Sequence, residues 1–337
     1  MSVLLTGANG LLGANLTRVL CAEGERPRLL LRERSDRRGL RGLSYEEASG
    51  DLLDRASLER AMAGVTHVYH VAGLVRLDRA SEAELRRVNV EGTRNVLLTA
   101  RAAGVKRVVH VSSVAAVGYG PLYAPATEDT RYNFEGRHPY HESKRDGEAV
   151  ALAAEGLEVV VANPTFIVGP YDIRPTSGEV LLGVARRLYR FYPSGGNNFV
   201  NAKDVAQGLV LAMKHGRPRE RYILGGENLT YREFLTQCAQ EAGVSPPVLP
   251  APELLMRGAG KLGDRLGRLS PALRNLSSSA IDACFTGAYV LSDKAFRELG
   301  YRPQPVRQGI REAYRWFQDE GMLPRDFPLT PRGVVGA

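Results

Sequence analysis

The sequence predicts an α/β protein with a doubly wound parallel sheet, followed by a smaller, mainly helical carboxyl-terminal lobe. Short apolar runs rich in Val and Leu alternate with helical patterns through the first half of the chain. This alternation is typical of a parallel sheet covered by helices on both faces. After about Asn163 the pattern becomes mixed, and Gly- and Pro-rich links separate the helices.

Apolar runs predict the strands, and helical periodicity predicts the helices between them. The first strand is expected at Ser2–Leu5, a weaker one near 45–48, and the others at residues 28–31, 65–71, 105–111 and 159–162. Further helices are expected near residues 203–214, 231–241 and 306–319. Ligands bind such sheets at the carboxyl ends of the strands, so we expect the site there.

A glycine-rich turn follows the first predicted strand. Gly7 permits the tight turn, Gly10 lets the backbone approach a pyrophosphate, and Gly13 lets the next helix pack closely on the strand. The free N–H groups at the start of that helix attract phosphate. Because the strand precedes the turn and an apolar-periodic helix follows it, the pattern favours a dinucleotide site over an ordinary loop.

Tyr140 and Lys144 lie four residues apart in the segment YHESK, and therefore on one face of a helix. A free tyrosine titrates near pH ~10, so proton transfer near pH 7 requires a shift of about 3 units, roughly 4 kcal/mol. A neighbouring cation shifts the pKa in that direction. This pair is the predicted proton-transfer centre.

The net charge of +8 does not predict a nucleic-acid partner, because the arginines are spread through the chain and mixed with acids, as in residues 32–38. No helix-turn-helix, zinc-finger or aromatic RNA-binding signature accompanies them. An anionic small molecule is the simpler explanation for the cluster near Ser35. The length of 337 residues and the hydrophobic content of 44% suffice for a sizeable core.

No membrane span, signal peptide or metal site is predicted. No stretch reaches the ~18 consecutive apolar residues of a span, and the N-terminal strand has no charged leader, so we expect a cytoplasmic protein. The cysteines form no CxxC pattern, which favours reduced thiols. The following histidines lack ligand spacing and are expected to be structural or substrate-lining: His70, His110, His138 and His141.

The chain resembles the extended short-chain dehydrogenase/reductases, the NAD(P)-dependent epimerase/dehydratase group, along nearly its whole length. The matching segments are TGANGLLG (6–13), GDLLD (50–54), HVAG (70–73), NVEGTRNVL (89–97), HVSSVAAVG (110–118), YHESK (140–144) and NPTFIVGP (163–170). Within the group, LLLRERSDRRGL and RYILGGENLTYREF look most like dihydroflavonol 4-reductase-like proteins and the hopanoid-associated sugar epimerases of bacteria.

We accordingly divide the chain into three parts. Residues 1–163 are expected to form a Rossmann-type dinucleotide-binding domain that includes the catalytic residues. Residues 164–323 are expected to form a substrate-binding lobe interleaved with the sheet. Residues 324–337, rich in Pro and Gly, are expected to form a flexible tail.

The resemblance implies the catalytic roles. Tyr140 would be the general acid/base, and Lys144 would lower its pKa while holding the nicotinamide ribose. Ser113 would hydrogen-bond the substrate oxygen, with Ser112 as the neighbouring alternative. Asn89 lies where the family has a helix-kinking asparagine, although a plain helix asparagine explains it almost equally well.

The resemblance also implies the cofactor site. Asp51 and Leu52 are expected against adenine, and Pro164 and Thr165 against nicotinamide. Together with Tyr140 and Lys144, the implied cofactor-binding residues are Gly7, Asn9, Gly10, Leu11, Leu12, Gly13, Arg32, Arg34, Ser35, Asp51, Leu52, Val71, Ala72, Gly73, Pro164, Thr165 and Ile167.

The residues after the second strand predict which dinucleotide binds. An acidic residue there holds the ribose 2′-hydroxyl of NAD, whereas a basic one accommodates the phosphate of NADP. Arg32 follows the strand, and Arg34 and Ser35 add donors, which favours NADP. Glu33 leaves NAD open, because its carboxylate could face the ribose.

Three functions remain open, because this fold hosts several reactions. The first is a reductase or dehydrogenase of the dihydroflavonol 4-reductase type, acting on a hydrophobic or ring carbonyl/alcohol, as a monomer or homodimer. The second is a nucleotide-sugar epimerase or dehydratase with tightly bound cofactor. The third, a non-catalytic dinucleotide sensor, would not need Ser113, Tyr140 and Lys144.

Two segments are expected to bear on the substrate. Residues 119–138, which carry Gly, Pro and several tyrosines, are expected to form a mobile lid. Apolar and basic residues alternate at nearly helical spacing in residues 253–269. Core packing is the favoured interpretation of that helix, and a substrate lid or a peripheral membrane-surface helix is the alternative.

Overall fold

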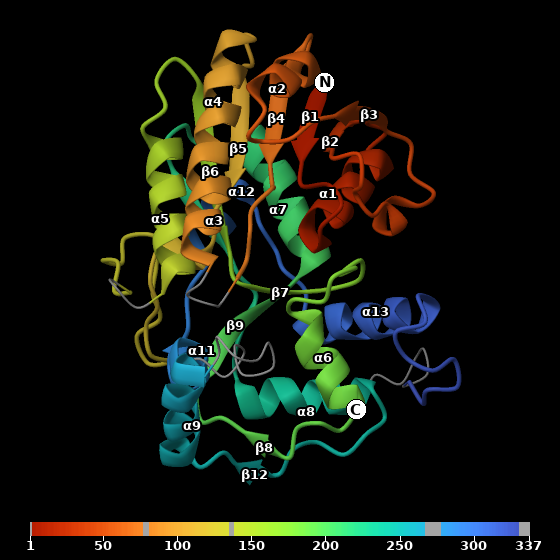
Figure 1. Ribbon diagram of the computed structural model, residues 1–337, viewed down its shortest axis with the longest axis vertical. Helices are drawn as coiled ribbons and strands as arrows, with labels where there is room; N and C mark the ends of the chain where they lie inside the picture. The colour runs from red at the N-terminus through yellow and green to blue at the C-terminus, as the bar shows by residue number, and fades with distance from the viewer. Residues whose placement is uncertain (1, 77–80, 135–137, 267–277, 330–337) are drawn as a thin grey trace.

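The computed structural model describes residues 2–76, 81–134, 138–266 and 278–329. Seven parallel strands form the main sheet in the order β10-β6-β5-β4-β1-β2-β3 (Figure 1). Their bounds are β1 Val3–Thr6, β2 Arg28–Leu31, β3 Glu46–Ser49, β4 His67–His70, β5 Arg107–Val111, β6 Glu158–Pro164 and β10 Arg221–Leu224. The predicted fold class, a doubly wound parallel sheet, is confirmed. The strand order reverses between β1 and β4.

Alternate residues of each strand pack under helices on opposite faces of the sheet. One face is covered by α1 (Leu11–Ala22), α7 (Ala202–His215) and α12 (Asp293–Leu299). The other is covered by α2 (Arg55–Met62), α4 (Thr93–Ala102) and α5 (Pro139–Leu152). Leu5, Tyr69 and Val109 are register partners in one row facing the first group, while their neighbours Leu4 and Val68 face the second. This double burial explains the unbroken apolar runs.

The carboxyl-terminal lobe has its own core. A small sheet contains β7 (Phe166–Val168), β9 (Gly196–Asn201), β11 (Glu227–Thr230) and β13 (Gly287–Ala288). Against it pack α6 (Gly178–Ala185), α8 (Tyr231–Glu241) and α13 (Val306–Asp319). A two-stranded ribbon of β8 (Phe191–Tyr192) and β12 (Leu249–Pro250), followed by α9 (Glu253–Leu266) and α11 (Ser278–Phe285), completes this end of the molecule (Figure 1).

Elements from the second half of the chain also complete the main sheet. α7 packs against α1, and β10 pairs in parallel with β6 at the edge of the sheet. No strand was expected at 221–224. Its apolar part has only three residues, Tyr222–Leu224, and it follows several polar and charged residues, so it lacks the length that marks the other strands.

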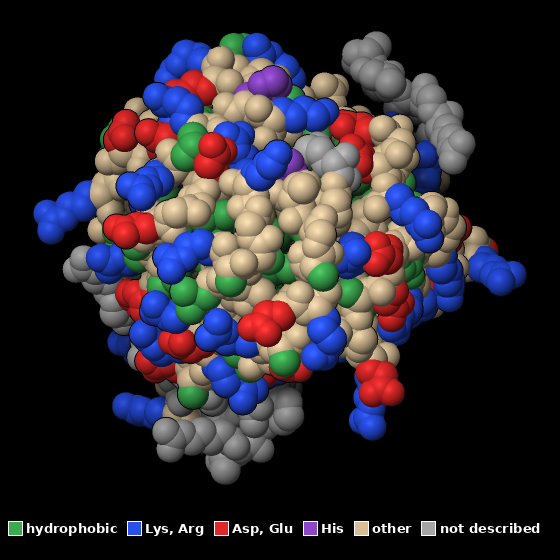
Figure 2. Space-filling model, turned by 90° about the horizontal axis from the view of Figure 1, so that it is seen from above, with side chains coloured by type: hydrophobic (Ala, Val, Ile, Leu, Met, Phe, Trp, Pro, Cys, Tyr) green, Lys and Arg blue, Asp and Glu red, His purple; other side chains and the backbone are tan. Residues whose placement is uncertain are grey.

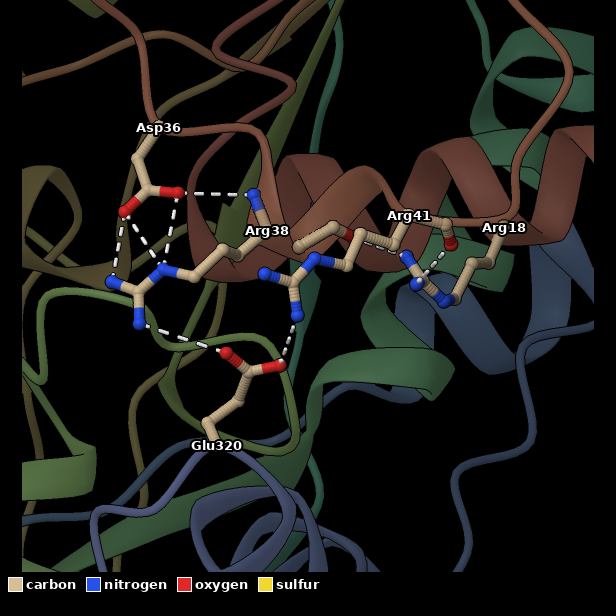
Figure 3. A network of polar contacts seen from close by, with 6 residues as sticks. Arg18, Asp36, Arg38, Arg41 and Glu320 are labelled. Carbon is tan, nitrogen blue, oxygen red and sulfur yellow. Dashed lines mark hydrogen bonds and ion pairs between the residues drawn. The ribbon is translucent and has the colours of Figure 1, made fainter.

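Arginines near β2 connect the sheet to α13 (Figure 3). The carboxylate of Glu320, which caps the carboxyl end of α13, lies 3.6 Å from Arg38 and 3.2 Å from Arg41. Arg38 also pairs with Asp36 at 2.8 Å. The guanidinium of Arg18 lies 3.6 Å from the ring centroid of Tyr171, in the link after β7. The turn that follows β2 is therefore held by both lobes.

The end of the chain is attached to α13 as far as it is described. The side-chain amide of Gln318 donates to the carbonyls of Pro324, Arg325 and Phe327 at 2.8 to 3.3 Å. Phe327 and Leu329 pack against the core of the lobe. Of the stretch expected to be a flexible tail, residues 324–329 thus make these contacts, and residues 330–337 lie outside the described residues.

The surface agrees with the mixed charges of the sequence. On the face seen in Figure 2, Lys and Arg side chains are interspersed with Asp and Glu. None of the described helices is long and apolar enough to cross a membrane. The expectation that the helix at 253–269 packs its apolar residues into the core is wrong for Leu255 and Leu262, which are exposed because Gly260 of α9 faces α11 instead. Residues 267–269 lie outside the described part.

Candidate active site

The predicted site residues gather at the carboxyl ends of the parallel strands, where the strand order reverses. The glycine turn follows β1, Arg32–Ser35 follow β2, Asp51 and Leu52 follow β3, and Val71–Gly73 follow β4. Ser113 follows β5, and Pro164 ends β6. Tyr140 and Lys144 lie on α5, while Ile167 lies in β7, where it pairs with Val200 of the second sheet.

The glycine turn is packed too tightly for side chains at two positions. Gly7 has φ +75°, and a Cβ there would lie 2.6 Å from the backbone nitrogen of Ala72. A Cβ on Gly13 would lie 2.1 Å from the carbonyl oxygen of Gly7. Gly10 differs, because its Cβ would meet no atom closer than 3.6 Å. Gly7 and Gly13 are therefore needed for close packing, whereas Gly10 leaves open space beside the backbone.

That open space lies at the amino end of α1. Gly10 caps the helix without any side-chain hydrogen bond, and the first turn contains no acidic residue. The N–H groups of Leu11 and Leu12 therefore remain available, and the helix dipole makes this end electropositive. A pyrophosphate fits such a position, and the geometry thus meets the requirement of a dinucleotide.

A buried chain of hydrogen bonds lies next to the glycine turn and supports it. His70 is fully buried, with Nδ1 2.8 Å from the hydroxyl of Thr6 and Nε2 3.1 Å from the hydroxyl of Thr93. The Thr93 hydroxyl donates to the Asn89 carbonyl, so it accepts from Nε2–H, and the Thr6 hydroxyl donates to Nδ1. Burial lowers the pKa of His70 to about 3, so the ring stays neutral. His70 is therefore structural.

Asn89 lies in an irregular segment that ties the loop after β4 to α5. It belongs to a π-helical stretch, η3 (Arg87–Gly92), between α3 (Glu82–Arg86) and α4. Its side chain accepts from the N–H of Leu74 at 2.8 Å and donates to the Leu74 carbonyl and the Ser143 hydroxyl at 3.0 Å. A Cβ on Gly147 would lie 2.3 Å from the Asn89 carbonyl oxygen, so α5 approaches closely here.

Tyr140 and Ser113 meet where α5 begins beside the end of β5. The His138 ring accepts from the N–H of Tyr140 at 3.0 Å, and Pro139 occupies the first turn, which fixes the start of the helix. Burial raises the pKa of Tyr140, and a hydrogen bond from the Ser113 hydroxyl opposes that rise. Ser112 is buried, and its hydroxyl has no partner among the described residues. Ser113 thus contacts Tyr140.

The Lys144 side chain points toward the backbone at the carboxyl ends of β5 and β4. Its ammonium donates to the Val111 carbonyl at 3.1 Å and would lie 3.4 Å from a Cβ on Gly73. Burial lowers the pKa of Lys144 to about 8, although Glu148 opposes this shift. Burial is the main cause of the shift at Tyr140, so the phenol pKa moves opposite to the direction expected from the sequence.

Sequence reasoning missed a buried network behind Ser113. The side-chain amide of Asn163 donates to the Ser113 carbonyl at 2.9 Å and to the Glu148 carboxylate at 2.6 Å. Glu148 is 2% exposed and pairs with Arg221 of β10 at 3.1 Å. The spacing offered one signal, because Glu148 follows Lys144 by four residues and lies on the same helix face. This network connects β5, β6, α5 and β10.

The turn after β2 presents two unpaired cations. The Ser35 hydroxyl accepts from the N–H of Arg32 at 3.1 Å, which closes the turn. Within the described structure, the guanidinium groups of Arg32 and Arg34 are exposed and pair with no acid, whereas Arg37 pairs with Glu47. The turn can therefore receive an anion.

The remaining predicted residues are held by local contacts. The Asp51 carboxylate accepts from the N–H of Leu53 at 2.9 Å. Leu52 is buried, and its Cβ would lie 3.2 Å from a Cβ added to Gly92. The Thr165 hydroxyl donates to the side chain of Asn198 at 2.9 Å. No group of three or more His, Cys, Asp or Glu suited to a metal ion occurs among the residues described.

A family model described as "NAD dependent epimerase/dehydratase family" matches residues 3–225, which include the glycine turn, Ser113, Tyr140, Lys144 and β10. The chain belongs to this family. The expected membership is thereby confirmed, and the protein is an oxidoreductase, epimerase or dehydratase homologue whose family uses a nicotinamide dinucleotide.

Its relatives include redox enzymes and sugar-nucleotide enzymes. Sterol demethylase protein B of Methylococcus capsulatus is 39% identical over 96% of this chain and 100% of that protein. A Synechocystis protein named "Putative dihydroflavonol 4-reductase" is 33% identical over 95% of each. The crystal structure of gox2253 aligns with a TM-score of 0.85 at 36% identity, covering 96% of this chain and 99% of that one. PA4631, a nucleoside-diphosphate-sugar epimerase from Pseudomonas aeruginosa, aligns with a TM-score of 0.80 at 27% identity over 95% and 98%.

The glycine turn yields a matched pair of variants. Gly13→Ala forces a methyl group against the Gly7 carbonyl and should lower the free energy of unfolding by about 1–3 kcal/mol. Gly10→Ala meets open space and should cost less than about 1 kcal/mol. It should nevertheless weaken dinucleotide binding roughly tenfold or more. Urea denaturation and dinucleotide titration check this; equal loss of stability in both variants would contradict it.

The lowered pKa of Lys144 predicts a pH-dependent stability. Between pH 8 and the usual pKa of 10.5, the unfolded chain binds more protons at this lysine than the folded protein. The folded protein therefore becomes more stable relative to the unfolded chain as the pH rises through that window. Relative to Lys144→Met, the wild type should become more stable by about 3 kcal/mol from pH 8 to 10.5, as measured by urea denaturation without dinucleotide. Parallel stability curves would show that Lys144 is not desolvated.

Proposed function

We propose that this protein is an NADP-preferring reductase or dehydrogenase that acts on a hydrophobic or ring carbonyl/alcohol. The observation that carries the proposal is the placement of the Ser113 hydroxyl against the Tyr140 phenol, with Lys144 buried beside Gly73 at the point where the strand order reverses. A dinucleotide sensor requires none of these three side chains.

We assign the following roles to the chain's own residues. Ser113 hydrogen-bonds the substrate oxygen, and Tyr140 donates its phenolic proton to that oxygen as the carbonyl becomes an alcohol. Lys144 holds the ribose and, when charged, favours the phenolate that remains. The bound nicotinamide supplies the hydride. Because burial raises the pKa of Tyr140, the protein alone keeps the phenol protonated, which is the form needed for reduction.

An aromatic cavity supports a hydrophobic substrate. A cavity of about 250 Å³ is lined by Tyr119, Gly120, Pro121, Asn133, Phe134, Thr286 and Gly287. The Tyr119 ring packs edge-on against Phe134 with the ring centroids 4.6 Å apart, and Phe134 stacks on His141, the residue after Tyr140. The described lining contains no Lys or Arg, which a sugar nucleotide diphosphate would require.

The relatives support the same substrate class. The proteins named for sterol demethylation and dihydroflavonol reduction suggest ring compounds with little charge, and both matches extend over nearly the whole chain. The similarity to PA4631 keeps a nucleotide-sugar epimerase or dehydratase as the second candidate. Tightly retained NAD in the purified protein, with no net consumption of NADPH, would favour that candidate.

Tyr140→Phe tests the acid/base role. The variant removes the transferable proton but preserves the ring, so turnover should fall at least a hundredfold while dinucleotide affinity changes less than about threefold. Lys144→Ala should impair both. Steady-state rates and dinucleotide titration measure these effects, and Tyr132→Phe, at a tyrosine outside α5 whose hydroxyl donates to Glu142, is the matched control. Wild-type turnover by Tyr140→Phe would refute the assignment.

Arg32 and Arg34 should set a preference for NADP over NAD. A 2′-phosphate paired with a guanidinium gains about 1.5–3 kcal/mol that a ribose hydroxyl does not. Arg32→Gln with Arg34→Gln should therefore lower the NADP/NAD affinity ratio by roughly ten- to hundredfold, with little change for NAD. Arg55→Gln with Arg60→Gln on the exposed face of α2 is the control. If the wild type binds NAD more tightly, Glu33 reads the ribose and NADP preference is wrong.

A further inference from the structure

Helix α9 exposes its large apolar side chains and buries its small ones. Leu254, Leu255 and Leu262 are 85%, 71% and 55% exposed. On the opposite side, Gly260 packs so closely on α11 that a Cβ there would lie 3.0 Å from Ser278. Gly263 is also buried. A helix stabilised only by packing within its own chain would place leucine, rather than glycine, in the contact.

The ribbon before α9 continues the exposed apolar surface. Phe191 of β8 and Leu249 of β12 are register partners, 48% and 53% exposed. The N–H of Ala251 donates to the Tyr192 carbonyl at 2.8 Å, which fixes the start of α9 against this ribbon (Figure 1). We define the apolar rim as Leu188, Phe191, Val248, Leu249, Leu254 and Leu255, each at least 48% exposed. Exposed apolar side chains gathered on successive elements in this way are typical of an interaction site.

Cations accompany the apolar rim. At about 100° per residue, Lys261 and Arg265 project within ~20° of the direction of Leu254. Both are exposed, as is Arg190, next to Phe191. Arg257 is already paired with Glu253 and Asp282. The rim is therefore a hydrophobic surface with positive charge beside it.

We propose that the apolar rim docks on an anionic lipid bilayer. Leucines and an aromatic ring would enter the boundary between headgroups and acyl chains, while Lys261, Arg265 and Arg190 would contact lipid phosphates. A second copy of the chain fits less well, because a self-complementary contact over this rim would bring the same cations together. The docking is peripheral, since no described helix can span a membrane.

The docking surface adjoins the aromatic cavity. α11 packs against α9, and the residues that follow α11, Thr286 and Gly287, line the cavity together with Tyr119. An apolar substrate that leaves the bilayer would therefore reach the cavity along α11. This consequence, unlike the docking itself, rests on the proposed function.

Vesicle flotation of the full-length protein tests the docking without any measurement of activity. The protein should float with vesicles that contain phosphatidylglycerol, and less as the salt concentration rises. Lys261→Gln with Arg265→Gln should weaken binding by roughly thirtyfold. Leu254→Ser with Leu255→Ser should abolish flotation. Leu98→Ser, which changes an exposed leucine of α4 far from the rim in sequence, should float like the wild type.

The outcomes separate the alternatives. Thermal melts of every variant establish that it is folded, which mutation of exposed side chains should preserve. Absence of flotation of the wild type, or unchanged flotation of the Leu254/Leu255 variant, overturns the proposal. A further outcome is that the wild type is an oligomer without vesicles and the Leu254/Leu255 variant a monomer. In that case a second copy of the chain covers the apolar rim, and the lipid assignment is wrong. If Tyr140→Phe loses turnover but floats like the wild type, docking does not depend on the reaction.

Discussion

The hydrogen-bond chain that runs from Thr6 through His70 and Thr93 to Asn89 holds the candidate site together. It joins β1, β4 and the π-helical segment at the reversal of strand order, and every member is buried. The Thr6 hydroxyl also accepts from the N–H of Ala72, which places the loop after β4 against Gly7. Because such a network functions only when each donor has an acceptor, His70 must remain neutral. The position of the glycine turn depends on that protonation state.

Burial then shifts the pKa values of the two residues proposed to act in catalysis. Tyr140 and Lys144 are both displaced toward their neutral forms, since desolvation raises the pKa of the phenol and lowers that of the ammonium. A ligand that favours a phenolate at Tyr140 or an ammonium at Lys144 must therefore offset this desolvation.

Much of the fold followed from local patterns, since buried parallel strands carry unbroken apolar runs and the glycine turn has a distinctive spacing. The weak strand near 45–48 is confirmed as β3, and its weakness has a physical cause: it is an edge strand with exposed Glu46 and Glu47. β10 was missed because a short edge strand gives little apolar signal. The predicted site residues are brought together because parallel strands end on one edge of the sheet.

Long-range polar contacts were beyond sequence reasoning. Asn163, Glu148 and Arg221 are separated by up to 73 positions, and nothing in their local sequence shows that they meet. The direction of the leucines on α9 was also unpredictable, because apolar periodicity shows that a helix has an apolar face but not which face its neighbour covers. Here the glycine face is covered by α11.

The ion pairs of Glu320 with Arg38 and Arg41 are a weak link between α13 and the turn after β2. Arg41 is 68% exposed, so its pair is weak and easily exchanged for water. The sheet, by contrast, is locked by a continuous core. Breaking the pair of Arg41 with Glu320 would therefore cost little free energy, while the strands stay in register and α13 stays packed in the core of its lobe. The molecule thus joins a rigidly packed sheet and lobe by exposed ion pairs, and these pairs lie on the turn that also carries Arg32 and Arg34.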